Sequence, residues 1–156
     1  MTVCGNENVI HRLCVITRGY PCRANQTWFP FVRQFAYAAA RQGVDVTVVA
    51  PLPLHLAWRG RDPVRDIEDA GNGRVIEVLR PRYVSLSDRR LGSWNTIKLG
   101  FEFFCRVVER TVKRDVPWRP DALYGHFLYM GGAAAVRVGQ KMGIPAFPMV
   151  GEGRLN

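Results

Sequence analysis

The chain has 156 residues, which is the length of one ordinary domain and leaves little room for a second. Its composition, 47% hydrophobic and 22% charged, is that of a globular protein and excludes a disordered chain or a fibre. The 22 Lys and Arg residues outnumber the 13 Asp and Glu residues, so the formal net charge is +9. A surface of this charge attracts acidic partners such as nucleic acid, anionic lipid or phosphorylated substrates.

Two patterns bear on where the protein works. No stretch approaches the roughly 20 apolar residues that a membrane-spanning helix requires. Residues 1–8 lack the basic and then apolar pattern of a secretory signal peptide, so we expect a cytoplasmic protein.

The four cysteines form neither a C-x-x-C pair nor a cluster with histidine at zinc spacing. We therefore predict structural thiols and no metal site, the thiols being Cys4, Cys14, Cys22 and Cys105.

The first half of the chain has the pattern of a βαβ unit. Residues 9–17 are a β-branched run of strand length, residues 27–42 have helical periodicity, and residues 44–50 form a second β-branched run. Two strands joined by a helix within about forty residues are expected to be parallel. Asn25 or Thr27 can cap the helix. The apolar face of that helix is expected to contain Trp28, Phe31, Val32, Phe35 and Ala39.

The rest of the chain repeats the alternation after a gap. Residues 54–72 are polar and arginine-rich without a sustained period, so we expect a long connection there. Strands are then predicted at 74–80, 122–127 and 144–150, and helices at 93–114 and 130–141. Five strands alternating with helices predict an α/β fold with a doubly wound, mostly parallel, Rossmann-like sheet. The last strand is expected to leave an exposed apolar edge.

The predicted topology places a candidate site at one edge of the sheet. In doubly wound sheets, ligands bind outside the carboxyl ends of the strands, where the strand order reverses. With the first strand central, residues 18–28, 126–132 and 151–153 converge on that crevice. His126, at the end of the fourth strand, can accept a proton or bind a phosphate or sugar hydroxyl. An aromatic core residue with one satisfied ring nitrogen is the alternative.

Three further residues beside this crevice also allow two interpretations. Gly131 and Gly132 open the helix after the fourth strand, where missing side chains let a ligand approach backbone N–H groups. Close packing of helix and strand explains them equally well. Glu152 lies between two glycines on a turn and can bind hydroxyls, or is simply a solvated turn residue.

Absent motifs exclude several enzyme classes. The first strand is not followed by G-x-G-x-x-G, which argues against the common dinucleotide dehydrogenases. The P-loop pattern G-x-x-x-x-G-K-[ST] is missing, as are H-E-x-x-H and G-x-S-x-G. Spacing by itself therefore leads only to an α/β domain with a polar crevice.

A set of short segments in a fixed order gives a more specific indication of function than spacing does. They are Ile16-Thr17 with Gly19-Tyr20-Pro21, Phe31-Val32-Arg33-Gln34, residues 43–51, residues 120–127 with Tyr129 and Gly131, residues 141–145, and Gly151-Glu152. Together they span nearly the whole chain and resemble the N-terminal half of GT-B glycosyltransferases of the family 4 kind.

The resemblance implies a retaining transfer of a sugar from a nucleotide-sugar donor to an acceptor hydroxyl, without a metal or another cofactor. In this family the N-terminal domain shapes the acceptor side, and a second domain holds the donor. The resemblance makes His126 the candidate catalytic residue. The candidate substrate-binding residues are Gly19, Tyr20, Asn25, Gly131 and Glu152.

The same resemblance implies the partners. The donor-binding half of such an enzyme has no counterpart in this chain, so we expect a truncated or split form that is inactive by itself. Its partners would be a glycan or lipid-linked acceptor, a separate donor-binding subunit, and an anionic membrane surface at the inner face of the membrane. Residues 74–114 hold much of the positive charge, and Leu99 and Phe103 in the long helix can touch a bilayer; a solvated basic face is the alternative.

Two other functions remain open. The chain can be a non-catalytic interaction subunit with this fold. It can also be a basic nucleic-acid-binding α/β domain, which the charge favours. The sequence contains no recognition helix of known pattern, zinc finger or RNP-like aromatic strand, so nucleic acid is the weaker candidate partner.

Overall fold

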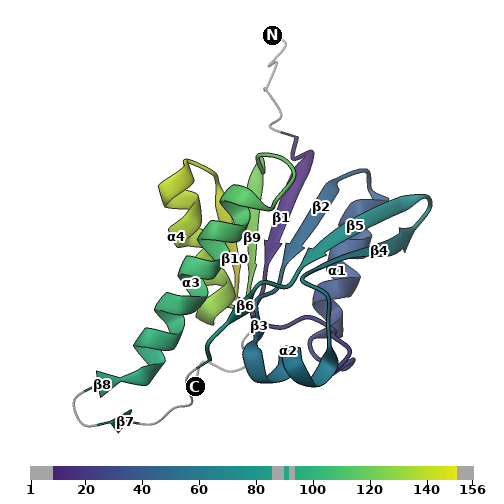
Figure 1. The fold of residues 1–156 in the computed structure, drawn as a ribbon. Helices are drawn as coiled ribbons and strands as arrows, with labels where there is room; N and C mark the ends of the chain where they lie inside the picture. The colour runs from purple at the N-terminus through teal and green to yellow at the C-terminus, as the bar shows by residue number, and fades with distance from the viewer. Residues whose placement is uncertain (1–8, 86–89, 92–93, 151–156) are drawn as a thin grey trace.

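The computed structural model describes residues 9–85, 90–91 and 94–150, and within them the chain forms one six-stranded sheet in the order β10-β9-β1-β2-β5-β4 (Figure 1). All of these strands except β4 run parallel, and β4 pairs antiparallel with β5. The strands are β1 (Arg12–Ile16), β2 (Asp45–Val49), β4 (Arg65–Gly71), β5 (Arg74–Leu79), β9 (Ala122–His126) and β10 (Ala146–Met149). The predicted α/β fold with a mostly parallel, Rossmann-like sheet is confirmed.

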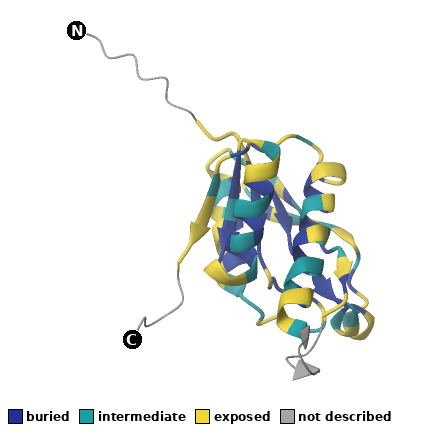
Figure 2. Cartoon of the chain, turned by 90° about the vertical axis from the view of Figure 1, so that its left-hand side faces the viewer, coloured by how far each residue is buried: buried dark blue, intermediate teal, exposed yellow. Residues whose placement is uncertain are grey.

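Helices cover the two faces of this sheet. Helix α1 (Pro30–Arg41) lies on one face, and α3 (Thr96–Arg114) and α4 (Ala133–Met142) lie on the other. Because alternate residues of a strand face opposite sides, Leu13 and Val15 of β1 pack toward α1, whereas Cys14 and Ile16 pack toward α3 and α4. A strand covered on both faces must be apolar throughout, which explains the continuous β-branched runs of β1 and β2. Figure 2 shows these buried strands between the helices.

Helix α1 begins later than predicted, and a different set of its residues is buried. It begins at Pro30, after Phe29 in the left-handed conformation, and neither Asn25 nor Thr27 caps it with a side-chain hydrogen bond. Its buried residues are Val32, Ala36 and Ala40. The predicted aromatic members of the buried face lie elsewhere: Phe31 and Phe35 are exposed, and Trp28 precedes the helix. Small side chains let α1 approach the sheet closely, which leaves the large rings at its margin.

The prediction of a long connection over residues 54–72 is wrong. This segment contains helix α2 (Leu54–Gly60) and the antiparallel edge strand β4. The inward side chains of β4 include Asp66 and Glu68, which form ion pairs with Arg80, a buried arginine directly after β5. A strand whose inner face is acidic has no apolar alternation for a sequence pattern to detect.

Smaller elements complete the described chain. Strand β3 (Leu52–Pro53) pairs with β6 (Arg82–Tyr83), and β7 (Arg90–Leu91) pairs with β8 (Trp94–Asn95). An irregular π-type turn, η1 (Leu128–Gly132), separates β9 from α4. None of the helices within the described ranges has the length and apolarity needed to cross a membrane.

The described cysteines behave as predicted. Cys14, Cys22 and Cys105 are buried and unpaired. Burial raises the pKa of Cys14 to about 12 and that of Cys105 to about 11, so both thiols stay protonated and unreactive at neutral pH. Cys4 lies outside the described residues.

Candidate functional site

The strand order reverses between β1 and β9, as the sequence predicts. From β1 the chain proceeds outward through β2 to β5, then returns to place β9 on the other side of β1. The loop after β1, residues 17–29, and the turn after β9, residues 127–132, therefore flank this point at the carboxyl edge of the sheet. Open α/β sheets bind their ligands at such a position.

Strained backbone gathers at the same edge. Phe29 (φ 50°), Phe127 (φ 63°) and Met130 (φ 61°) have positive φ although none is glycine. Such conformations cost about 1–3 kcal/mol each and are concentrated at functional sites. The other described non-glycine residues of this kind, Arg61 and Asn72, lie at a helix end and in a hairpin turn, where local geometry explains them.

Between the two loops is a small space that we call the switch-point hollow, lined by Arg18, Phe29, Phe127 and Tyr129, with a volume of about 200 Å³. The Arg18 guanidinium carbon lies 5.8 Å from the centre of the Phe29 ring, which in turn meets the Phe127 ring edge-on at 5.0 Å. None of the described residues that line the hollow is acidic. The hollow thus combines one cation with three aromatic rings.

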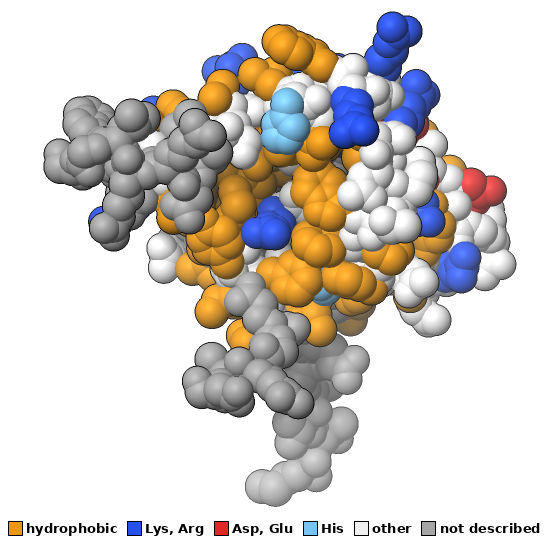
Figure 3. Space-filling model, turned by 90° about the horizontal axis from the view of Figure 1, so that it is seen from below, with side chains coloured by type: hydrophobic (Ala, Val, Ile, Leu, Met, Phe, Trp, Pro, Cys, Tyr) orange, Lys and Arg blue, Asp and Glu red, His pale blue; other side chains and the backbone are white. Residues whose placement is uncertain are grey.

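The hollow continues toward α3. An adjoining space of about 270 Å³ shares Arg18 and Tyr129 and extends to Tyr83 and Phe101. Figure 3 shows the carboxyl edge from below, with hydrophobic side chains around a hollowed centre and basic side chains more abundant than acidic ones. This face is therefore both apolar and cationic.

A second concavity lies on the α1 side of Phe127. We call it the aromatic groove; it has a volume of about 650 Å³. The Phe35 ring stacks on the Tyr124 ring at 4.4 Å, and the Phe31 ring lies 5.1 Å from the imidazole of His126. The groove is lined by Phe31, Phe35, Tyr124, His126, Phe127 and Met149.

His126 lines this groove but is only 6% exposed. Its Nδ1 lies 3.0 Å from the hydroxyl oxygen of Tyr124, which also lies 2.7 Å from Sδ of Met149. Which of Nδ1 and the hydroxyl donates depends on the tautomer of the ring. In the tautomer with its proton on Nδ1, Nε2 keeps its lone pair. Burial lowers the pKa of His126 because it disfavours the charged ring. The imidazole is therefore neutral at pH 7, and the tautomer that donates from Nδ1 to Tyr124 can accept a proton at Nε2.

The two glycines after β9 serve close packing. A Cβ on Gly131 would overlap the carbonyl oxygen of His126, and one on Gly132 would lie 2.7 Å from that of Phe127. The N–H of Gly132 donates to the Phe127 carbonyl at 2.6 Å, so this donor is already used within the protein. Of the two interpretations left open by the sequence, the packing role of Gly131 has direct geometric support; a ligand role for it stays a prediction.

Gly19 lies against Phe29, one of the rings that line the switch-point hollow. A Cβ there would overlap the ring of Phe29, so the absence of a side chain lets that ring lie across the loop. The Thr17 hydroxyl donates to the Gly19 carbonyl at 2.8 Å and holds the turn. Gly19 is thus needed to shape the hollow.

The other predicted binding residues are not brought into the hollow. Tyr20 is buried, and its hydroxyl donates to Glu68 at 2.9 Å. Asn25 is exposed, and its side-chain oxygen accepts hydrogen bonds from the N–H and hydroxyl of Thr27 at 3.1 and 2.9 Å. Glu152 lies outside the described residues.

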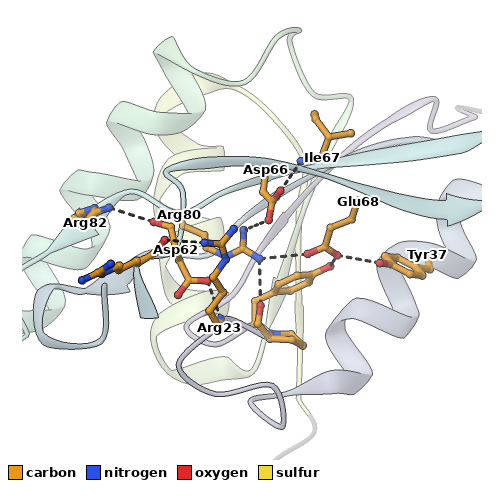
Figure 4. A network of polar contacts seen from close by, with 11 residues as sticks. Arg23, Tyr37, Asp62, Asp66, Ile67, Glu68, Arg80 and Arg82 are labelled. Atoms are coloured by element: carbon orange, nitrogen blue, oxygen red, sulfur yellow. Dashed lines mark hydrogen bonds and ion pairs between the residues drawn. The ribbon is translucent and has the colours of Figure 1, made fainter. Parts of the chain in front are cut away.

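A buried polar network holds the loop after β1 in place (Figure 4). Arg80 is 4% exposed and donates to the Pro21 carbonyl, Asp66 and Glu68 at 3.2, 3.2 and 3.3 Å. Glu68 also accepts the hydroxyls of Tyr20 and Tyr37 at 2.9 and 3.0 Å. The loop that carries Arg18 is thereby tied to β4 and α1.

Sequence reasoning missed several of these residues. Arg18, Phe127 and Tyr129 each follow a strand that meets the switch point, a position that marks them once the strand order is known. Arg80 could be suspected because it is an arginine directly after an apolar run, with two carboxylates spaced like strand neighbours nearby.

Comparisons with known proteins add little. No protein-family model matches the chain, and none of the curated proteins matches it. Among solved structures, the C-terminal domain of a hydrogenase from Pyrococcus furiosus is similar over 89% of this chain and 90% of that chain, with 12% sequence identity and a TM-score of 0.48. This similarity is too low to assign a shared function.

Proposed function

We propose that the chain is the acceptor-side domain of a retaining glycosyltransferase, and that the phosphate-bearing end of a lipid-linked acceptor binds in the switch-point hollow. The observation that carries the proposal is the position of Arg18 among the rings of Phe29, Phe127 and Tyr129, between β1 and β9. The ordered segments that resemble family 4 glycosyltransferases support the same reaction class.

The chemistry of the hollow suits such an acceptor. A guanidinium binds phosphate through two parallel N–H donors, and it does so best where surrounding rings exclude water. Aromatic rings offer apolar area to a lipid chain or to the C–H face of a sugar. The absence of acidic residues among the described lining leaves Arg18 available to an anion.

His126 is placed to act on the acceptor rather than on the phosphate. Phe127 lines both the hollow that contains Arg18 and the aromatic groove that contains His126, so the two concavities adjoin at this residue. In the proposal, the neutral imidazole accepts the proton of the acceptor hydroxyl at Nε2. The nucleotide sugar is held by a separate donor-binding subunit, and the chain without it is inactive.

A lipid-linked acceptor requires the protein to reach a membrane, and α2 supports peripheral binding to its inner face. Trp58 is 74% exposed on this helix, and its neighbours Arg59 and Arg61 are exposed too. An exposed tryptophan beside arginines is suited to the interface of an anionic bilayer. In Figure 1, α2 lies at the lower edge, where the strands end, so docking would bring the hollow toward the lipid.

The proposal is tested by titrating the isotopically labelled chain with farnesyl diphosphate, a soluble lipid phosphate, and following backbone amide shifts. Inorganic diphosphate and farnesol are titrated separately, because the proposal requires both the anion and the apolar chain. We expect the largest shifts at residues 18–20 and 127–131. Shifts confined to the exposed basic residues of α3, or equal responses to diphosphate by itself, would contradict the proposal.

A further inference from the structure

One part of the sheet lacks a covering layer. Mostly parallel sheets are normally covered on both faces. Helix α1 covers β1, β2 and β5, but beyond Tyr124 on β9 the sheet face on its side is open, and Phe147 and Met149 of β10 are 53% and 44% exposed. In the strand register, Phe147 lies beside Tyr124 and Met149 beside His126. We call the surface of Phe35, Tyr124, Phe147 and Met149 the bare face.

The bare face is long enough for an extended partner. Its lower part is the aromatic groove of about 650 Å³, which contains Met149. At its upper end, Phe147 lines a separate hollow of about 580 Å³ with Val9 and Ile10. The aromatic groove at Met149 and the upper hollow at Phe147 thus lie along β10, and α1 borders the first of them.

An added strand is a poor occupant. The amide of Leu123 donates to the Pro145 carbonyl, and Ala146 and Pro148 are the residues in register with Leu123 and Gly125. In a parallel pair with this register, the backbone groups of Ala146 and Pro148 face away from β9, toward the free edge. Pro148 has no N–H, so the edge lacks a donor in its middle. A helix needs no such donor and fits the layer that α1 already occupies.

The charged residues near the bare face indicate that a partner helix would carry acidic side chains. Arg12 and Arg119 line the upper hollow. The one acidic residue among the described lining, Asp121, is occupied by the backbone N–H groups of His11 and Arg12 at 3.0 and 2.9 Å. None of the ion pairs between described residues includes Arg12. A second copy of this chain, which carries a formal charge of +9, would bring like charges together.

We infer that the bare face binds an amphipathic helix of a partner protein, with its apolar stripe on Phe35, Tyr124, Phe147 and Met149 and acidic side chains at the end near Arg12 and Arg119. Such a helix presents its apolar residues at three- and four-residue steps, as in other helix-in-groove complexes. It would complete the second layer over β9 and β10. The bare face shares the aromatic groove with His126, but it does not include Arg18 or the switch-point hollow. Binding of a helical peptide and binding of farnesyl diphosphate therefore test the two proposals separately.

The test uses two synthetic amphipathic peptides of about four helical turns, with the same leucine stripe and either Glu or Lys along its flanks. Binding to the full chain is measured by fluorescence anisotropy. We expect the Glu peptide to bind at least about tenfold more tightly than the Lys peptide. Equal affinities would overturn the inference.

Variants distinguish the bare face from general attraction to a basic protein. Phe147→Ser should weaken binding of the Glu peptide about tenfold, whereas Val75→Ser, at another exposed strand position (62% exposed), should leave it unchanged. Arg119→Glu should reduce the preference for the Glu peptide. Equal binding by all three variants would overturn the assignment. Sedimentation equilibrium tests whether a second copy of the chain occupies the bare face. A dimer that Phe147→Ser dissociates would assign the face to that second copy and overturn the inference.

Discussion

The hydroxyl oxygen of Tyr124 lies 3.0 Å from Nδ1 of His126, two residues further along β9. Because residues two apart on a strand share a face, both side chains belong to the α1 side of the sheet. The contact holds the ring orientation of His126, which is almost fully buried.

Burial lowers the pKa of His126 below 6.5, its value in the unfolded chain. At acidic pH the unfolded state therefore binds a proton more readily than the folded state, so the contribution of His126 to stability is complete above pH 6.5 and declines as the pH falls. We expect the difference in the free energy of unfolding between wild type and His126→Gln to shrink between about pH 7 and about pH 5. Urea unfolding at each pH measures it. A difference that grows on acidification would show that the folded state favours the charged ring.

Arg80 should be among the most sensitive positions outside the hydrophobic core. Arg80→Met leaves Glu68 and the Pro21 carbonyl without their buried donor, and we expect a loss of about 3 kcal/mol in the free energy of unfolding. Arg59→Met, at an exposed position of α2, is the matched control and should change stability little. Similar losses for both variants would mean that the network does not hold the loop.

Two glycines of the site should respond differently to alanine. The added methyl group of Gly131→Ala meets the backbone carbonyl of His126, which cannot move without shifting β9, so we expect a loss of about 2–3 kcal/mol. In Gly19→Ala the methyl group meets the side-chain ring of Phe29, which can rotate, and the loss should be about 1 kcal/mol. Thermal unfolding of both variants ranks them. The reverse order would contradict the packing role of Gly131.

Trp58 provides a test of membrane binding. We expect the chain to sediment with vesicles of phosphatidylcholine and phosphatidylglycerol at low salt, and Trp58→Ser to weaken this binding about tenfold or more. Val64→Ser removes another exposed apolar side chain, 52% exposed, and serves as the control. Equal binding to purely zwitterionic vesicles, or an unaffected Trp58→Ser variant, would exclude docking through α2.

The elements that were predicted correctly from the sequence are those whose pattern of apolar residues follows directly from burial. Residues 13–16 of β1 and 46–49 of β2 are buried at every position and almost all apolar, and α3 and α4 have clear helical periods. Strand β4 was missed because Asp66 and Glu68 point inward to Arg80, a long-range pairing that leaves no local period. The prediction of the buried face of α1 was also wrong. Phe31 and Phe35 fit the helical period of the apolar stripe, but in the structure they line an open groove.

The candidate site was predicted in position but not in composition. The strand order places the crevice between β1 and β9, as expected. His126 lies at the end of β9, yet Tyr20 is turned into the core, where Glu68 holds its hydroxyl. The convergence of residues 18–28 and 126–132 was expected from the strand order. Which of their side chains line the hollow, namely Arg18, Phe29, Phe127 and Tyr129, depends on loop conformations that no spacing rule encodes.

The central claim is that Arg18 makes the switch-point hollow an anion site for a lipid-linked acceptor. Calorimetric titration of farnesyl diphosphate into wild type, Arg18→Gln and Arg110→Gln, the last a change at an exposed residue of α3, tests it most directly. The account predicts that Arg18→Gln weakens binding at least about tenfold while Arg110→Gln binds like wild type. Equal affinity of all three proteins for the ligand would contradict it.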